Sequence, residues 1–115
     1  MINERMEHLD FLKNGVVNAV IFYKDSLQLE LDNATLTCYT WPLVLGDSHD
    51  YNHQHPDYKN QLCQLINQPV VEVSESSKGL IITFENGELL FEKEGPREIL
   101  VITDGNGEWQ SYPNL

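Results

Sequence analysis

Basic residues are scarce in this chain: seven Lys and Arg stand against 18 Asp and Glu, which gives a formal net charge of −11 over 115 residues. Nucleic acids and anionic membranes are bound through Lys and Arg against phosphate, so this charge argues against both as partners. A basic protein, by contrast, would be attracted. The alternative is an acidic surface that serves solubility alone, and composition by itself favours that alternative.

Long apolar runs and cysteine motifs are missing as well. No segment approaches the ~20 apolar residues of a membrane helix. The acidic first residues, Met1 to His8, lack the basic and apolar stretches of a secretory signal. The two cysteines, Cys38 and Cys63, form no Cys-x-x-Cys motif, which argues against structural zinc and redox sites. Both lie among apolar neighbours, so we expect buried free thiols in a cytoplasmic protein.

The hydrophobic content and the length of the chain predict a single globular domain that spans residues 1–115. Hydrophobic residues make up 41% of the chain, which is normal for a folded protein. A chain of this length buries roughly two-thirds of the surface that its unfolded form exposes, so it needs neither a disulfide nor a metal to fold.

The most specific pattern is an internal duplication. Sliding the sequence by 53 residues aligns segment 12–36 with segment 65–89 without a gap. The matched positions keep apolar residues two apart and a tight turn, as a β-meander requires. The identities are Leu12/Leu65, Asn14/Asn67, Val17/Val70, Val20/Val73, Leu27/Leu80, Asn33/Asn86 and Leu36/Leu89, with conservative matches at Leu29/Ile82, Leu31/Phe84 and Asp32/Glu85.

Each repeat unit, about 12–40 and 65–93, is predicted to form three short strands. In the second unit these run over 70–75, 80–85 and 88–92, because apolar residues alternate along them and Asn86-Gly87 suits a type I′ hairpin turn. The spacing of Val17 and Val20, repeated in the second unit, breaks strict alternation and predicts a bulge in each first strand.

Three further segments lie outside these strands. A helix is expected over 3–12, with Asn3 as its cap, and a second over 56–66 at the end of a connector that spans 41–66. In the second helix Tyr58, Leu62, Leu65 and Ile66 are spaced to share one face. Residues 97–113 are predicted to form a C-terminal hairpin around Asp104-Gly-Asn-Gly107. The predicted fold is mainly β (α+β), with duplicated three-stranded units packed as a sandwich or half-barrel and two short helices.

One polar cluster could serve as a site. The segment 46–56 places Asp47, His49, Asp50, His53 and His55 close together. Imidazole and carboxylate are ligands that zinc or nickel would accept, but a loop without a ligand from a rigid element rarely preorganises a metal. A solvated connector is the more ordinary interpretation, and a loop that binds a partner is the third. We therefore expect no metal and no cofactor.

No catalytic set is recognisable, so an enzyme is not expected. The chain lacks a Gly-x-Ser-x-Gly motif, and nothing pairs Cys63 with a histidine. The many carboxylates do not single out a dyad, and the glycines of 104–107 belong to a hairpin turn. Trp41, Trp109 and Tyr112 could stack on a sugar, but aromatic residues more often pack the edge of a sandwich.

Acidic residues crowd the second unit. Three of them, Glu72, Glu88 and Glu92, could share a solvent-facing surface across neighbouring strands. A basic partner would make use of such a surface, and a merely solvated face is the alternative. The full candidate partner-binding set is Glu72, Glu75, Glu85, Glu88 and Glu92 with Asp47, His49, Asp50, His53 and His55.

The repeated pattern, seen in Leu65-Ile-Asn-Gln-Pro-Val-Val-Glu-Val73 and Leu80-Ile-Ile-Thr-Phe-Glu-Asn-Gly-Glu-Leu89, resembles an uncharacterised family of small bacterial β-rich domains with an internal duplication. Some relatives in that family are immunity proteins of polymorphic and contact-dependent growth-inhibition toxins. The resemblance covers about 12–91, and the first copy departs from it with Asn33-Ala34 in place of a turn glycine.

The resemblance implies a protein that neutralises a toxin by covering it and has no catalysis of its own. Many such toxins are basic nucleases, which an acidic protein would mask. The expected function is therefore that of an immunity protein, a monomer or weak dimer, which binds a basic toxin domain through the acidic second unit or the 47–55 loop. The alternative is a β-domain that binds a small ligand or a metal through that loop and Trp41.

Overall fold

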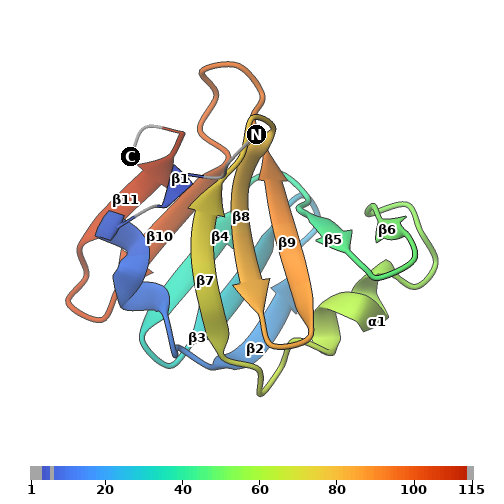
Figure 1. Ribbon diagram of the computed structural model, residues 1–115, viewed down its shortest axis with the longest axis horizontal. Helices are drawn as coiled ribbons and strands as arrows, with labels where there is room; N and C mark the ends of the chain where they lie inside the picture. The colour runs from blue at the N-terminus through green and yellow to red at the C-terminus, as the bar shows by residue number, and fades with distance from the viewer. Residues whose placement is uncertain (1–3, 6, 114–115) are drawn as a thin grey trace.

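The computed structural model describes residues 4–5 and 7–113, which form two antiparallel sheets packed face to face (Figure 1). This confirms the predicted mainly β fold. The six-stranded sheet, here the β7–β9 sheet, has the order β1 (Glu4–Arg5), β7 (Val70–Glu75), β8 (Gly79–Phe84), β9 (Gly87–Glu92), β5 (Leu43–Leu45) and β6 (Asp50–Tyr51). The five-stranded sheet, here the β2–β4 sheet, has the order β11 (Trp109–Tyr112), β10 (Leu100–Asp104), β4 (Ala34–Cys38), β3 (Leu27–Leu31) and β2 (Val17–Phe22).

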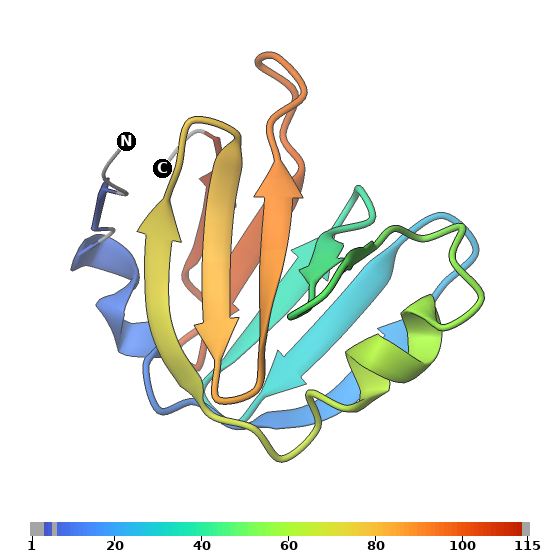
Figure 2. The same ribbon diagram turned by 45° about the vertical axis from the view of Figure 1, so that its right-hand side comes forward.

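The core lies between the two sheets, whose strands cross obliquely (Figure 2). The alternating apolar residues of β3 and β8 face inward as predicted: Leu29 and Ile82 are fully buried, and their strand neighbours two positions away are buried as well. Each such side chain contributes roughly 1.5–3 kcal/mol relative to an exposed one. Burial of these two inward faces therefore fixes which side of each sheet meets solvent.

The duplication is visible in the backbone. The register shifts once between Val17 and Ala19 of β2 and once between Val70 and Glu72 of β7, and the two shifts lie 53 residues apart. These irregularities confirm the predicted bulges. Asn67 adopts a φ of 76°, and its repeat partner, 53 residues earlier, adopts 69°. Asparagine tolerates this left-handed region better than most residues, which explains the repeated asparagine.

The two halves also contact each other through equivalent atoms. The Asn14 N–H donates to the Val70 carbonyl at 2.8 Å, and the Asn67 N–H donates to the Val17 carbonyl at 2.8 Å. The two donors occupy equivalent positions of the repeat, and so do the two acceptors, as they would across a two-fold axis. The repeat units therefore pair with each other at their first strands, before the two sheets diverge.

Each half also completes the sheet of the other half. After β4 the chain crosses over, and β5 pairs with β9, so that Val44 lies opposite Leu89. After β9 the chain crosses back, and β10 pairs with β4, so that Ile102 lies opposite Leu36. The connector and the C-terminal hairpin are thus counterparts of each other rather than additions to the repeat. The exchange interlocks the halves, since neither sheet is complete without strands from both.

The helices differ from the sequence-based expectation. The first is a 3₁₀ helix, η1 (Glu7–Leu12), preceded by β1, and the expected cap Asn3 lies outside the described residues. In a 3₁₀ helix, residues three apart lie one above the other, so both Leu9 and Leu12 reach the core and are fully buried.

The second helix, α1, spans only Tyr58–Cys63. Because it ends at Cys63, the helical spacing does not extend to Ile66, which is 37% exposed and not on the buried face as predicted. Cys63 is exposed too, contrary to prediction, whereas Cys38 is buried. In the part of the chain that the structure describes, no helix is both long enough and apolar enough to span a membrane.

Candidate functional site

The register places acidic residues of three strands in one row on the outer face of the β7–β9 sheet. Glu72 lies opposite Thr83, Thr83 opposite Glu88, Glu88 opposite Leu45, and Leu45 opposite Asp50. The neighbouring row of Val73, Ile82, Leu89 and Val44 is buried between the sheets. Successive residues of a strand point to opposite faces, so the acidic row faces solvent. We call Glu72, Glu88 and Asp50 the acidic row.

Glu88 of the acidic row is anchored by a side-chain hydrogen bond. Its Oε2 accepts a hydrogen bond from Thr83 Oγ1 at 3.0 Å, which holds the carboxylate over the middle of the sheet. Glu92 lies on the same strand four residues further on and therefore on the same face. The sheet thus gathers Glu72, Glu88 and Glu92 of the second unit and Asp50 of the 47–55 loop, which were predicted as two separate regions, on one surface.

Glu75 has a different environment from the other acidic candidates. Its Oε2 accepts a hydrogen bond from the Tyr112 hydroxyl at 2.6 Å and forms an ion pair with Lys93 Nζ at 3.2 Å. The Tyr112 hydrogen bond and the nearby Lys93 hold the pKa of Glu75 below its usual value. Burial, together with the adjacent carboxylate, raises the pKa of Tyr112. Glu75 therefore joins β7 of one sheet to β11 of the other.

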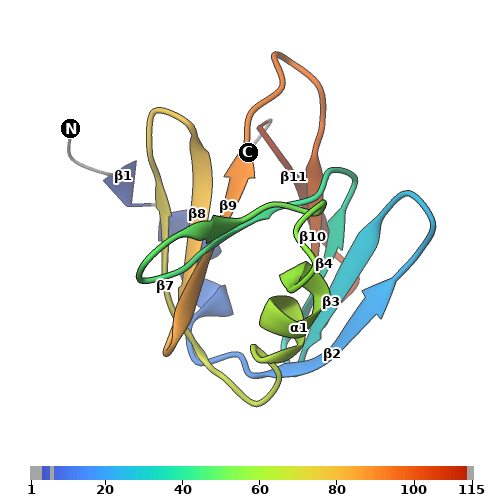
Figure 3. The ribbon, with the colours of Figure 1, turned by 90° about the vertical axis from the view of Figure 1, so that its right-hand side faces the viewer.

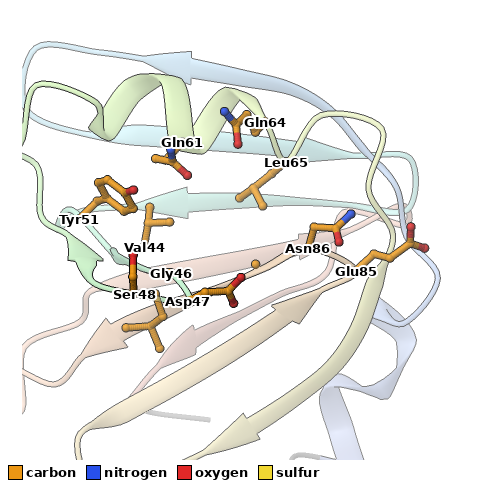
Figure 4. Close-up of a pocket in the computed structure, with 12 residues that line it drawn as sticks. Val44, Gly46, Asp47, Ser48, Tyr51, Gln61, Gln64, Leu65, Glu85 and Asn86 are labelled. Carbon is orange, nitrogen blue, oxygen red and sulfur yellow. The ribbon is translucent and has the colours of Figure 1, made fainter.

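A cleft of about 450 Å³ lies beside the acidic row, between the β5–β6 hairpin, α1 and the β8–β9 turn (Figure 4). Asp47 comes from the hairpin and Glu85 from the turn, and both side chains are exposed. Gln61 and Gln64 of α1 line the opposite wall. The described residues that line this cleft include two carboxylates and no Lys or Arg. We call this hollow the acidic cleft. Its lining favours a cationic group.

The three histidines of the 47–55 loop do not converge. His49 and His55 form a ring cluster with Tyr51, with centroids 4.4 Å apart for His49–Tyr51 and 4.8 Å for Tyr51–His55. His55 Nδ1 accepts the backbone N–H of Asp57 at 3.0 Å. His53 instead stacks on Trp41, with ring centroids 5.9 Å apart. Among the described residues, no group of three or more His, Cys, Asp or Glu is arranged to hold a metal ion.

The ring cluster has a structural consequence for the acidic cleft. Tyr51 belongs to β6, whereas His55 precedes α1, so their contact ties the hairpin to the chain that leads into the helix. Both the hairpin and the helix line the acidic cleft. The contact of Tyr51 with His55 therefore helps to position the two walls of the acidic cleft relative to each other.

A second, smaller pocket lies around Trp41 and is lined by aromatic residues and two lysines. Trp41 and His53 were candidate residues from the sequence alone, whereas Lys24 and Lys59 were not. The sequence contains two short runs in which an aromatic residue precedes a lysine, Tyr23-Lys24 and Tyr58-Lys59. The packing of α1 beside β2, which brings these runs together, is not visible in the sequence.

The fold and surface together define a duplicated, strand-exchanged β-sandwich with one acidic sheet face. Comparison of the chain with protein-family models, with curated proteins and with solved structures finds no match.

Proposed function

We propose that the protein binds a basic protein through the acidic row and the adjacent acidic cleft, in the manner of an immunity protein that covers a bacterial toxin domain. The observation that carries this proposal is the register that aligns Glu72, Glu88 and Asp50 across one sheet. Each of the three carboxylates is separated from the next by one strand, and together they present a row of negative charge that a complementary basic surface would recognise.

The other sheet provides an internal comparison. The row equivalent to the acidic row consists of Ala19, Glu30, Thr35, Thr103 and Trp109 and carries a single carboxylate. The two rows descend from the same repeat and occupy matching places in their sheets. Acidic residues are therefore concentrated on one of two otherwise similar faces. A general need for solubility would be met by either face, whereas a specific partner requires one.

The acidic cleft adds a place for an anchoring side chain. Lysine or arginine at the centre of the partner's interface would enter between the hairpin and the β8–β9 turn, where Asp47 and Glu85 supply negative charge and the glutamines of α1 supply amide oxygens. Basic side chains that fill such pockets often dominate the affinity of an interface. The acidic row around the cleft would mainly accelerate association and set its dependence on salt.

The test is copurification of the chain with the protein encoded beside it, followed by affinity measurements on charge-reversal variants. The triple variant Glu72→Lys, Glu88→Lys and Asp50→Lys should weaken a one-to-one complex by about 100-fold or more, mostly through slower association. The proposal also requires that the wild-type complex weaken steeply as salt concentration rises.

A matched control is available on the other side of the molecule. The variant Asp25→Lys, Glu30→Lys and Glu108→Lys changes the net charge by the same amount, and all three side chains are exposed. It should alter affinity by no more than about 3-fold, because only the general field of the protein changes. Equal losses in the two triple variants would show that net charge, not the acidic row, governs binding, and an unaffected complex would remove the proposed surface altogether.

A further inference from the structure

The pocket around Trp41 is built from four parts of the chain. Its lining residues are Phe22, Tyr23, Lys24, Trp41, His53, Tyr58 and Lys59, and its volume is about 270 Å³. They come from β2 and the turn after it, from the β4–β5 connection, from the segment after β6, and from α1. Figure 3 shows α1 at this side of the molecule, between the two sheets. The pocket is separate from the acidic cleft, with which it shares no lining residue.

The aromatic walls of the pocket are held in place by packing. The Trp41 and His53 rings are nearly parallel, with an interplanar angle of 16°, and Tyr58 meets the indole edge-on at 81°. Tyr58 is almost fully buried, and its hydroxyl donates a hydrogen bond to the Pro42 carbonyl. Rigid flat walls of this kind bind flat apolar groups at a small entropic cost.

The pocket also collects positive charge in an acidic protein. Lys59 Nζ lies 5.4 Å from the centroid of the Phe22 ring, and Lys24 follows in the adjacent turn. Within residues 4–5 and 7–113, neither lysine forms an ion pair, whereas Lys13, Lys93 and Arg97 all do. The pocket lining contains no carboxylate. Two of the chain's seven basic residues thus flank one aromatic pocket without a local acidic partner.

The repeat shows that this corner has diverged from its counterpart. Phe22 occupies the position that Glu75 occupies in the second half, 53 residues later. There the corner contains the contact of Glu75 with Tyr112 and Lys93. In the first half the carboxylate is replaced by a phenyl ring and an open pocket. The packing of the sandwich is therefore compatible with a polar contact at this corner, and the aromatic pocket is a feature of one half.

We propose that this pocket binds a small molecule that joins a flat ring to one anionic group, a carboxylate or a phosphate. The ring packs among Trp41, Tyr58 and Phe22, and the anion lies between the ammonium groups of Lys24 and Lys59. One water molecule occupies about 30 Å³ of the liquid. A pocket of about 270 Å³ therefore has room for a ligand of about ten non-hydrogen atoms, but not for a whole nucleotide. Lys24 and Lys59 line the pocket and no Asp or Glu does, so the lining itself offers an anion positive charge only.

The experiment is a titration of the ¹⁵N-labelled full chain with four probes, followed through the indole N–H of Trp41 and the backbone amides of Lys24 and Lys59. Phenyl phosphate carries both the ring and the anion, benzyl alcohol the ring alone, inorganic phosphate the anion alone, and benzylamine the ring with the opposite charge. Trp109→Phe assigns the two indole signals. Phenyl phosphate should give saturable shifts with a dissociation constant below about 1 mM, at least about 10-fold tighter than any other probe.

Variants separate this site from binding at the general surface. Lys24→Gln with Lys59→Gln should weaken phenyl phosphate binding by about 10-fold or more, whereas Lys13→Gln with Lys78→Gln, which has the same net charge, should leave it within about 2-fold. Lack of saturation, equal binding of benzylamine, or equal effects of the two double variants would each overturn the proposal. The acidic-row variants do not touch this pocket, so failure here leaves the protein-binding proposal standing.

Discussion

The contact between Tyr112 and Glu75 provides a sharp test of how the two sheets are joined. Tyr112→Phe removes only the hydroxyl that donates to Glu75 Oε2 at 2.6 Å and keeps the ring, which is almost fully buried. A hydrogen bond to a charged group contributes about 1.5–3 kcal/mol. Lys93 Nζ, 3.2 Å from the same oxygen, remains in the variant and offsets part of the loss. We therefore expect a decrease of about 1.5 kcal/mol in the free energy of unfolding, or roughly 6 °C in Tm.

The pH dependence distinguishes a charge-assisted bond from simple packing. The pKa of Glu75 is lowered from its ordinary value of 4.5 in the folded protein. Its contribution to stability is therefore fully present above pH 4.5 and is lost as the pH falls through the folded pKa. The pKa of Tyr112 is raised from its ordinary value of 10.0, so its contribution is present below pH 10 and is lost as the pH rises through the folded pKa. The difference between wild type and Tyr112→Phe should be constant from about pH 6 to 9 and shrink below pH 4.5.

The assay is urea unfolding followed by fluorescence at a series of pH values, with Glu75→Gln and the double variant completing a thermodynamic cycle. The cycle should give a coupling energy of about 1 kcal/mol at pH 7 and less than half of that at pH 3. A cost of Tyr112→Phe that is the same at both pH values would refute the charge-assisted bond. A coupling energy near zero would show that the hydroxyl acts independently of Glu75.

Two further predictions concern backbone contact and thiol exposure. A Cβ at Gly79 would lie 2.1 Å from the carbonyl oxygen of Phe91, whereas a Cβ at Gly105 would meet nothing within 4 Å. Gly79→Ala should therefore cost about 2–3 kcal/mol in chemical denaturation and Gly105→Ala less than about 0.5 kcal/mol; similar costs would contradict the close β8–β9 pairing. A thiol reagent should modify one cysteine of the native protein, Cys63, and reach Cys38 only on unfolding, because Cys38 is buried and burial raises the pKa of its thiol. Rapid reaction of both thiols in native buffer would contradict this packing.

Much of the candidate surface could be inferred from composition and strand periodicity. The alternation of apolar residues fixes which face of β8 is buried, and the outward positions of β7 and β9 follow from the same alternation, so Glu72 and Glu88 could be placed on one face. The environment of Glu75 could not be inferred. Its partner Tyr112 lies 37 residues away in the other sheet, and no local pattern predicts that contact.

By itself the sequence determined the duplication, the mainly β fold, the bulges and the acidic character of the chain. These features depend on neighbouring residues: period-2 alternation and the spacing of Val17 and Val20 act over a few positions. The type I′ turn predicted at Asn86-Gly87 was wrong, because neither residue has a positive φ and Gly87 already pairs with Phe84. The repeated asparagines at 14 and 67 likewise mark equivalent backbone positions, and both have a positive φ.

Only the tertiary structure decided which strands pair across the two halves. The crossing of β5 to β9 and of β10 to β4 buries both inner faces together, and the free energy of that burial depends on the whole chain rather than on any local segment. This exchange carries Asp50 into line with Glu88 and encloses the acidic cleft. The packing of α1 beside β2 likewise brings Lys59 to Phe22. The residue types of both candidate sites can thus be read from the sequence. Their proximity in space arises from non-local strand pairing and packing.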